Sequence, residues 1–188
     1  DHSVIALMYH RFDEPKYQST SISSELFEKH LKLIKENGFN VLNLKDFLDI
    51  LINKKKIPKK TLLITVDDAF RSFYDFAFPL LKKYNFPFSV FVSTASVSND
   101  EESDFMSWEM LKEIQKHKGR VFNHTVDHIS LVGLSDRMII DQVTKASSQI
   151  KLKLGSDSPK VFSYPYGESS KRVEKILEGL GILAAFSQ

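Results

Sequence analysis

Two neighbouring carboxylates, Asp67 and Asp68, end an apolar run that reads "LLITV" over residues 62–66. Branched apolar side chains and threonine in such a run predict a buried strand. Two adjacent negative charges at the end of a buried strand repel each other and are disfavoured at low dielectric. A nearby cation or a proton would offset both costs. The alternative is helix capping, for which aspartate is well suited, but a cap uses only one of the two residues.

A pair of histidines stands farther along the chain, in the stretch "NHTVDH" at residues 123–128. His124 and His128 are four residues apart, so a helical turn would place both rings on one side, as two imidazoles need to share one metal ion. Such a pair alone is more often a surface feature, but a carboxylate-rich strand end elsewhere favours metal binding. Asp127, between the histidines, is expected either to face solvent or to support a histidine from behind.

One aspartate and two histidines form a donor set with open positions, which is typical of catalytic rather than structural metal sites. Consecutive side chains at a strand end point in different directions, so we expect one aspartate to bind the ion and its neighbour to lie close by as a base. The same donor types hold iron in non-haem oxygenases, so the donor set alone leaves the reaction open. The second carboxylate favours hydrolysis, because it provides a base beside activated water.

Short apolar runs alternate with helical patterns along the chain, which predicts a parallel sheet with crossover helices. About seven strands and six helices fit an irregular, small or incomplete (β/α) barrel better than an open sheet, and we expect one domain over residues 1–188. A kink is expected at Pro79. The expected strands span residues 4–9, 39–44, 61–66, 88–93, 120–123, 160–164 and 182–186, and the expected helices span residues 23–38, 45–54, 72–85, 107–119, 134–155 and 169–181.

Four of the predicted strand ends carry polar residues of catalytic types. They read "MYH" at 8–10, "VDD" at 66–68, "NHTVDH" at 123–128 and "YPYG" at 164–167. In parallel α/β folds the catalytic residues sit in loops that leave the carboxyl ends of strands, so these four ends would meet on one rim. Their convergence is more informative than any one motif.

The bulk properties exclude several classes of protein. The net charge of +2 comes from 26 basic and 24 acidic residues, so electrostatics favours no nucleic-acid partner. There is no cysteine, hence no disulfide and no thiolate metal site. No stretch approaches the roughly 18 apolar residues of a transmembrane segment, and no basic-then-apolar leader is visible. The basic cluster "NKKKIPKK" at 53–60 is expected to be a solvated loop.

Taken together, the motifs resemble those of the polysaccharide deacetylases of carbohydrate esterase family 4, the NodB-homology domain. "TVDDAF" is similar to the family's T-F-D-D-G motif, "HTVDH" to H-[ST]-x-x-H and "SYPYG" to R-x-P-Y, and the resemblance covers essentially the whole chain. It implies an irregular (β/α) barrel and one divalent metal ion, zinc by default, with nickel, cobalt or iron fitting nearly as well. The site residues that it implies are Asp67 as catalytic base, Asp68, His124 and His128 as metal ligands, the backbone N–H of Tyr166 as oxyanion donor, and Pro165 as the residue that fixes its loop.

Several positions depart from the family pattern. Ala69 stands where glycine is usual, Val66 where phenylalanine is common, and Ser163 where the motif has the arginine that orients the base. The carboxy-terminal L-x-H motif, source of the general-acid histidine, does not occur before Gln188. "LMYHRF" near the start instead resembles the poly-N-acetylglucosamine deacetylase branch, whose first strand supplies that histidine and whose motif lacks the arginine. This similarity implies that His10 is the general acid.

Two of these residues have plainer alternatives. Histidine is the side chain that suits proton donation near neutrality, but His10 could instead be a histidine hydrogen-bonded at a strand terminus. Trp108, the only tryptophan, resembles the family's tryptophan that lines the pocket for the acetyl methyl group, with core packing as an equal alternative. Tyr164 and Tyr166 either stack on sugar rings or pack against the barrel rim.

The resemblance implies a metal-dependent hydrolase that removes N-acetyl groups from a hexosamine-containing polysaccharide or oligosaccharide of the poly-N-acetylglucosamine type. An O-acetyl carbohydrate esterase and a catalytically impaired glycan- or metal-binding domain are the alternatives, the second prompted by Ser163 and Ala69. Iron oxygenases usually have antiparallel β-sandwich frameworks, which the strand–helix alternation opposes. Such polymers occur outside the cell, so we expect an exported or cell-envelope protein.

Overall fold

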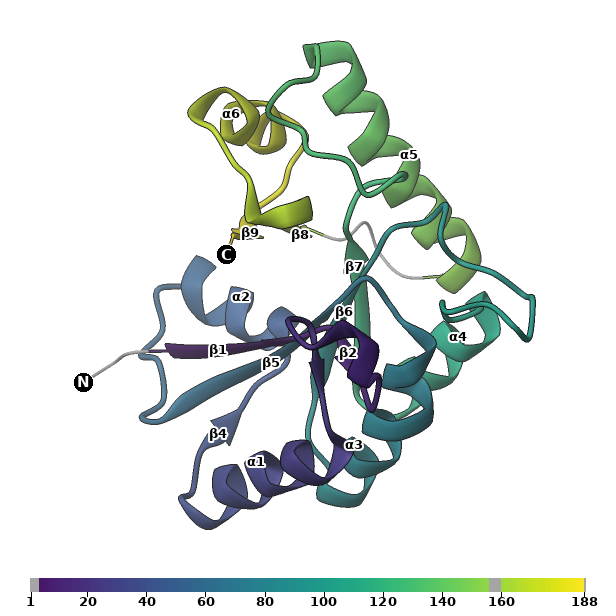
Figure 1. The fold of residues 1–188 in the computed structure, drawn as a ribbon. Helices are drawn as coiled ribbons and strands as arrows, with labels where there is room; N and C mark the ends of the chain where they lie inside the picture. The colour runs from purple at the N-terminus through teal and green to yellow at the C-terminus, as the bar shows by residue number, and fades with distance from the viewer. Residues whose placement is uncertain (1–3, 156–159, 188) are drawn as a thin grey trace.

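The computed structural model describes residues 4–155 and 160–187, and its main feature is a curled parallel sheet (Figure 1). The strands run in the order β1-β5-β6-β7-β8-β9, with β4 beside the start of β5. All of these pairings are parallel. The strands are β1 (Val4–Tyr9), β4 (Asn40–Val41), β5 (Thr61–Asp67), β6 (Phe88–Val92), β7 (Gly119–Asn123), β8 (Val161–Ser163) and β9 (Ala184–Phe186).

The prediction of an irregular (β/α) barrel of about seven parallel strands is confirmed. The barrel is open, because β1 and β9 form the two ends of the strand order and are not paired with each other in the described residues. One parallel pair was not predicted. It consists of β2 (Arg11–Phe12) and β3 (Ser21–Ile22), strands of two residues each, which are too short to show a period of two in the sequence.

Six α-helices connect the strands within the described residues, and a serine or asparagine caps the start of five of them, whereas the helix that begins at Phe78 has no side-chain cap. The side chains of Ser23, Asn43, Ser107, Ser135 and Ser170 each accept a backbone N–H of the following helix, which satisfies one of its free donors. The helices are α1 (Ser24–Glu36), α2 (Leu44–Ile52), α3 (Phe78–Tyr84), α4 (Trp108–Lys116), α5 (Asp136–Leu154) and α6 (Lys171–Gly179), with short 3-10 turns at Pro15–Tyr17 and Pro165–Gly167.

The expected helix over residues 72–85 is divided in two. Its first part, Phe73–Ala77, is a π-helical turn, and α3 follows with Pro79 in its first turn. Proline has no N–H to donate, so the regular hydrogen-bond ladder is interrupted at this point. The irregularity expected at Pro79 therefore takes the form of a π-helical segment.

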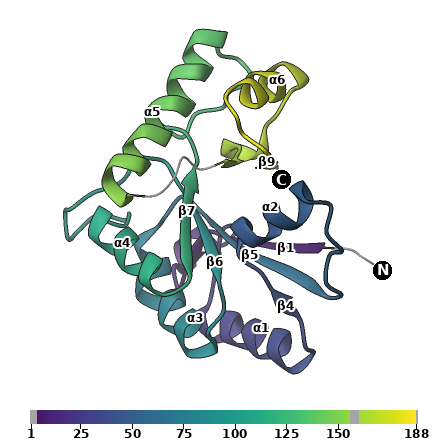
Figure 2. The ribbon, with the colours of Figure 1, turned by 180° about the vertical axis from the view of Figure 1, so that it is seen from behind.

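Successive side chains of β5 point to opposite faces of the sheet, and each face has its own hydrophobic cluster. Leu62, Ile64 and Val66 belong to the outer core, which the helices on the convex side cover. Leu63 belongs to an inner cluster with Leu44 of α2. Figures 1 and 2 both draw α2 between β1 and β9, and it fills the concave side of the open barrel.

The same alternation determines which residues reach the interior at the carboxyl ends of the strands. Asp67 has the inward parity of Leu63, and Ser163 at the end of β8 has the inward parity of Val161, another member of the inner cluster. The sheet thus brings residues that are 96 positions apart to the same rim.

The basic stretch at 53–60 is an exposed loop at the other end of β5, as expected. Among the described residues, no helix is both long and apolar enough to cross a bilayer.

The start of β7 gives a test of how closely the helices pack on the sheet. A Cβ atom at Gly119 would lie 2.7 Å from the carbonyl oxygen of Ile114 and 2.8 Å from the ring of Phe88. We expect Gly119→Ala to lower the free energy of unfolding by about 1–3 kcal/mol, because both neighbours must move. Gly133→Ala is the control, since nothing lies within 4 Å of the place its added methyl group would take. Urea unfolding curves compare the two, and equal midpoints would contradict the packing argument.

Candidate active site

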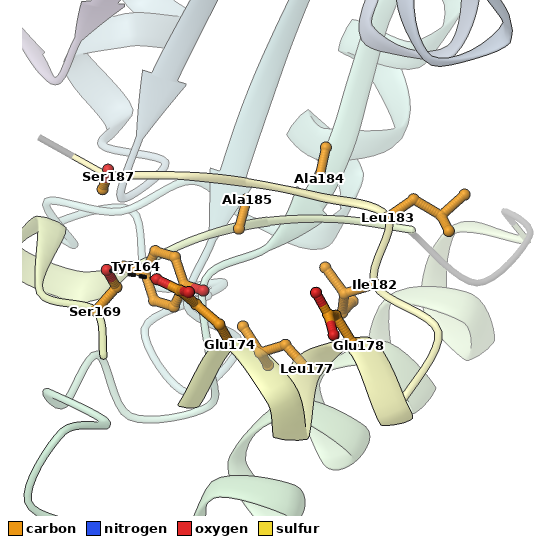
Figure 3. Close-up of a pocket in the computed structure, with 10 residues that line it drawn as sticks. All are labelled: Tyr164, Ser169, Glu174, Leu177, Glu178, Ile182, Leu183, Ala184, Ala185 and Ser187. Atoms are coloured by element: carbon orange, nitrogen blue, oxygen red, sulfur yellow. Dashed lines mark hydrogen bonds between the residues drawn. The ribbon is translucent and has the colours of Figure 1, made fainter. Parts of the chain in front are cut away.

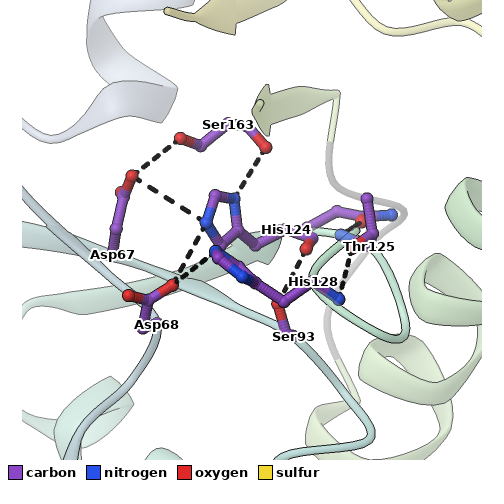
Figure 4. A network of polar contacts seen from close by, with 8 residues as sticks. Asp67, Asp68, Ser93, His124, Thr125, His128 and Ser163 are labelled. Carbon is purple, nitrogen blue, oxygen red and sulfur yellow. Dashed lines mark hydrogen bonds and ion pairs between the residues drawn. The ribbon is translucent and has the colours of Figure 1, made fainter. Parts of the chain in front are cut away.

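Three side chains from two strand ends meet at the rim of the sheet (Figure 4). Oδ1 of Asp68 lies 3.0 Å from Nε2 of His128 and 3.3 Å from Nε2 of His124. One donor atom from each of the three lies within 4.8 Å of the others, and the two imidazole rings have centroids 4.9 Å apart. The structure thus brings together the three side chains predicted to be metal ligands.

The hydrogen bond between Nδ1 of His124 and Ser163 determines which nitrogen of the neutral ring carries the hydrogen. Nδ1 of His124 lies 2.7 Å from the carbonyl oxygen of Ser163, which can only accept, so Nδ1 carries the hydrogen. In the neutral ring, Nε2 then directs a lone pair at Oδ1 of Asp68, a buried atom with no hydrogen bond. Two electron pairs facing each other need a proton or a cation between them. Two imidazoles and a carboxylate are donors that zinc and similar divalent ions accept, so the residues fit such an ion.

The pKa shifts of His124 and Asp68 also indicate that a positive charge is favoured at this site. Burial lowers the pKa of His124, but the hydrogen bond that its protonated ring donates to Asp68 and the negative charges of Asp67 and Asp68 outweigh burial and raise that pKa. Burial raises the pKa of Asp68, but hydrogen bonds from both protonated histidines and their charges bring it far below the ordinary value. Both shifts mean that a positive charge among these side chains is stabilised.

The predicted helical turn at residues 124–128 is wrong. His124 continues the line of β7, with its N–H bound to the carbonyl of Val92 at 3.1 Å, and the chain then bends without forming a helix. Thr125 (φ 72°) and His128 (φ 52°) are in the left-handed region. The two rings meet because of this bend rather than because of helical spacing.

Side-chain hydrogen bonds hold the bend in place. Oδ1 of Asn123 accepts the N–H of Thr125 at 2.8 Å, and Oγ1 of Thr125 accepts the N–H of His128 at 3.0 Å. The amide of Asn123 also donates to the carbonyl of Val143 in α5 at 2.8 Å, which ties the bend to the helix behind it. Local bonds of this kind compete with helix formation and explain why the spacing rule failed.

Asp127 is exposed and does not contact either histidine ring by any described bond. Its carboxylate accepts a hydrogen bond from Gln142 of α5, whose side-chain oxygen in turn accepts the N–H groups of Val126 and Asp127 at 3.0 Å. Of the two expectations for this residue, the solvent-facing one is correct. Its bond to Gln142 gives it a further part in anchoring the loop.

The two neighbouring aspartates point in different directions, as expected for a strand end. Oδ2 of Asp67 is 4.0 Å from Nε2 of His124, whereas Asp68 approaches both histidines. Asp68 (φ 71°) and Ala69 (φ 56°) are both left-handed, so the chain turns sharply out of β5. This backbone costs roughly 1–2 kcal/mol for each non-glycine residue, which explains why the family has glycine where this chain has Ala69.

Asp67 is almost fully enclosed, with 2% of its surface exposed. Its Oδ2 accepts a hydrogen bond from the hydroxyl of Ser163 at 3.0 Å, and its Oδ1 is buried with no partner in the described residues. Burial raises the pKa of Asp67, and the positive charges of His124 and His10 and the bond from Ser163 oppose that rise. A buried carboxylate with a raised pKa and a free oxygen is a suitable base. Its role as base stays a prediction.

Ser163 is the functional position that the sequence did not reveal. Its hydroxyl binds the Asp67 carboxylate, and its carbonyl binds Nδ1 of His124, so one residue orients both side chains. The family motif marks Ser163 only as the place of a missing arginine. The signal that could have found it is parity, because position 163 faces inward from β8 at the level of the strand ends.

His10 follows β1 directly and lies next to Asp67. The last pair of the β1–β5 ladder is Tyr9 with Val66, so His10 and Asp67 continue the register in adjacent strands and share its inward side. Its positive charge is near enough to lower the pKa of Asp67. The next residue, Arg11, is held by Glu14 at 2.8 Å and fixes the chain where it leaves the strand. This placement suits the predicted proton donor.

The turn after β8 lies over the histidines. Pro165 is buried and begins a 3-10 turn, and Tyr166 follows it with a left-handed backbone (φ 60°). Tyr166 is 63% exposed, and its ring meets the ring of His128 edge-on, with centroids 4.7 Å apart. The Tyr166 N–H has no acceptor among the described residues, whereas the next N–H, that of Gly167, is bound to Tyr164 at 2.9 Å. A free N–H beside the site is the feature an oxyanion donor needs.

Trp108 is placed mainly as a core residue. It is the first residue of α4, is half-buried and packs against the outer hydrophobic cluster. The structure therefore supports the core-packing alternative, and its contact with an acetyl group stays a prediction.

The sequence profile of the polysaccharide deacetylase family matches residues 54–185, which is most of the chain. The chain belongs to the polysaccharide deacetylase family. Among the relatives, YxkH of Bacillus subtilis (strain 168), named as a polysaccharide deacetylase, is 29% identical over 177 residues, or 93% of this chain. A poly-β-1,6-N-acetyl-D-glucosamine N-deacetylase of Staphylococcus aureus (strain MSSA476) is 28% identical over 212 residues, or 100% of this chain. This chain spans 61% of the length of YxkH and 72% of that of the staphylococcal enzyme.

Solved structures confirm the fold of this family member. IcaB from Ammonifex degensii superposes with a TM-score of 0.88 at 28% identity, covering 98% of this chain and 83% of IcaB. The deacetylase PplD of Streptococcus pyogenes, solved in complex with acetate, has a TM-score of 0.86 at 23% identity, covering 95% of this chain and 80% of PplD. The family predicted from the motifs is thus confirmed.

Metal binding can be tested by replacing single ligands. We expect His128→Ala and Asp68→Asn to weaken zinc binding by more than about a hundredfold. Loss of a residue that only supports a ligand lowers metal affinity by about 10–100-fold, and loss of the ligand itself should lower it further. Isothermal titration with zinc chloride measures the affinity. The matched control is His117→Ala, an exposed histidine of the α4 end that is paired with Glu113 instead. Unchanged zinc affinity in His128→Ala would contradict the site.

Proposed function

We propose that this protein is a metal-dependent hydrolase that removes N-acetyl groups from a hexosamine-containing polysaccharide of the poly-N-acetylglucosamine type. The observation that carries the proposal is the convergence of Asp68, His124 and His128 on one small volume beside the buried, half-paired carboxylate of Asp67. Membership of the polysaccharide deacetylase family and the staphylococcal relative's activity support the substrate class. Polymers of this class lie outside the cell, so we place the activity at the cell envelope.

The metal would be held by Asp68, His124 and His128 and would supply Lewis acidity toward the acetyl carbonyl and the attacking water. Zinc is the ion that this donor set favours, and nickel, cobalt and iron accept the same donors. Asp67 removes a proton from the water, because its Oδ1 has no hydrogen-bond partner in the described residues and its Oδ2 is held by Ser163. The Tyr166 N–H donates to the oxygen that becomes negative, an interaction worth a few kcal/mol in comparable sites.

His10 determines the preference for an amide over an ester. An amine leaves only when protonated, whereas an alcohol leaves more easily, so an N-deacetylase needs a proton donor beside the leaving group. His10 lies alongside Asp67 in the adjacent strand, on the inward side of the sheet. It gives its proton to the departing nitrogen. This placement favours N-acetyl hydrolysis over the O-acetyl esterase alternative.

The impaired-domain alternative rests on Ser163 and Ala69, and the structure weakens it at both positions. Ser163 binds the Asp67 carboxylate and so takes over the orienting contact expected of the arginine. Ala69 adopts the left-handed turn that glycine would adopt, and its carbonyl accepts the N–H of Met106 at 2.9 Å. Neither departure distorts the metal ligands or the base.

Acetate release tests the proposal directly. We expect release from β-1,6-linked N-acetylglucosamine oligomers, loss of activity on chelation and its return on adding zinc. Asp67→Asn should retain zinc binding and lower kcat by about 10²- to 10⁴-fold, the usual contribution of a general base. Retained turnover in Asp67→Asn would refute its assignment as base. Release from O-acetylated xylan but not from the amide substrate would instead support the esterase alternative.

The contribution of Ser163 can be separated from folding and from metal binding. Ser163→Ala removes the hydroxyl bound to Asp67 but keeps the carbonyl bound to His124. We expect kcat to fall by about ten- to a hundredfold, the equivalent of one hydrogen bond to a charged group, with KM and zinc affinity unchanged. Ser89→Ala, at a buried serine near the start of β6, is the matched control. An equal fall in kcat for both variants would show a structural effect only.

A further inference from the structure

A polar cavity lies on the outer side of the sheet, between α6 and the edge strand β9 (Figure 3). Its volume is about 240 Å³, and its lining includes two glutamates together with Tyr164, Leu177 and Ile182, which belong to a separate hydrophobic cluster between α5, α6 and β8. Drug-sized ligands occupy roughly 300–1,000 Å³, so this cavity suits a smaller group such as one sugar ring. None of the residues of the metal centre lines it.

Two carboxylates stand at the rim of this cavity without a basic partner. Glu174 and Glu178 are one turn apart on α6 and both line the opening. Within the ranges that the structure describes, neither forms an ion pair, and the one side-chain bond is from Ser169 to Glu174 at 3.4 Å. Most other acidic side chains that carry bonds on the helices, such as Glu28 with Lys83, are paired with a lysine. The two carboxylates at the cavity rim are therefore not held in ion pairs and are available to a ligand.

Tyr164 provides an independent indication of a ligand. Only 5% of the residue is exposed, and its ring packs edge-on against Phe162 with centroids 5.3 Å apart. Its hydroxyl has no hydrogen-bond partner in the described part of the chain, and Figure 3 shows it on the side of the cavity where Glu174 lies. Burial raises the pKa of Tyr164, and the charges of Glu174 and Glu178 raise it further, as expected for a phenol close to both. The ring of Tyr164 is thus buried while its hydroxyl is available to a molecule in the cavity.

We propose that this cavity binds a hexosamine unit that carries a free ammonium group, the product that the proposed function would generate. An ammonium has three N–H donors, and two carboxylates with a phenolic oxygen are three acceptors of suitable charge. Leu177 and Ile182 form an apolar floor for the C–H face of the sugar. An N-acetylated unit is neutral and cannot donate these charge-assisted hydrogen bonds. The cavity therefore binds the ammonium-bearing unit in preference to the acetylated one.

The position of the cavity relative to the metal centre supports this assignment. Tyr164 lines the cavity, and Tyr166, two residues later, lies against His128. Ser163 faces inward to Asp67 from the strand end that immediately precedes Tyr164. One short turn of chain thus has the metal centre on one side and the acidic cavity on the other.

Binding can be measured by nuclear magnetic resonance without any turnover. Methyl β-D-glucosaminide, at a pH where its amine is protonated, should give saturable shifts of the Ala184 and Ala185 amides, which line the cavity. Methyl N-acetyl-β-D-glucosaminide should leave them unchanged. Glu174→Gln/Glu178→Gln should weaken binding by about tenfold or more, as expected when charge-assisted hydrogen bonds are lost. Tyr164→Phe should weaken it by about severalfold while retaining the ring that packs in the core.

The matched control is Glu36→Gln/Glu102→Gln, which removes the same charge at exposed positions of α1 and of the loop before α4. Equal weakening in the control would show attraction by bulk charge only, and equal shifts with both sugars would exclude recognition of the ammonium. Either result overturns the proposal. Absence of acetate release by the unaltered protein would contradict the proposed function instead, and the binding measurement would still decide whether the cavity selects an ammonium-bearing sugar.

Discussion

The site depends on one electrostatic conflict, in which an ionised carboxylate and two imidazole nitrogens approach the same small volume. Oδ1 of Asp68 lies 3.3 Å from Nε2 of His124 and 3.0 Å from Nε2 of His128, and Nδ1 of His124 already binds the carbonyl of Ser163. A proton on one imidazole relieves the conflict for that nitrogen alone, whereas a divalent cation relieves it for all three atoms. The same cation would also favour the ionised form of Asp67 next to it, which burial alone disfavours. The proposed metal and the proposed base would therefore form one electrostatic unit.

The residues that carry this site have strained backbones, and the surrounding fold holds them in place. Asp68, Ala69, Thr125, His128 and Tyr166 all have left-handed backbones, at the ends of β5, β7 and β8. Such conformations persist only where the surroundings over-determine them, and they concentrate at functional sites. Here the surroundings are parallel strands in fixed register, capped helices behind them, and α2 filling the concave side. The packing of the strands and helices thus offsets the free-energy cost of the strained backbone at the strand ends.

The elements of the fold could be predicted because their causes are local. Alternating apolar residues, capping serines and closing glycines lie within a few residues of the structure they determine, and most strands and helices appear close to their expected ranges. The exceptions are the strand expected at 39–44, which is limited to Asn40–Val41, and the helix expected at 72–85, which is divided. The donor set of the metal site could also be predicted, because donor types follow from residue types. The loop conformation at His124 and His128 could not be predicted. Strand parity could have placed Ser163 on the inward side, but it would not have revealed the two hydrogen bonds of this residue. The loop depends on a bond to Asn123, and the bond from Ser163 to Asp67 joins residues 96 positions apart.

Charge also links the metal centre to the chain's outer face. Hydrolysis of an acetamide converts a neutral group into a carboxylate and an amine that becomes an ammonium ion near neutral pH. Next to a divalent cation the carboxylate is attracted and the ammonium is repelled, so the sugar product has an electrostatic reason to move away from the centre where it forms. The strand end that carries Ser163 inward is followed by Tyr164 on the outward side, where Glu174 and Glu178 form no ion pair among the described residues. With a divalent cation held at the candidate site, a single turn of chain would separate a centre that repels the ammonium from the cavity proposed to bind it.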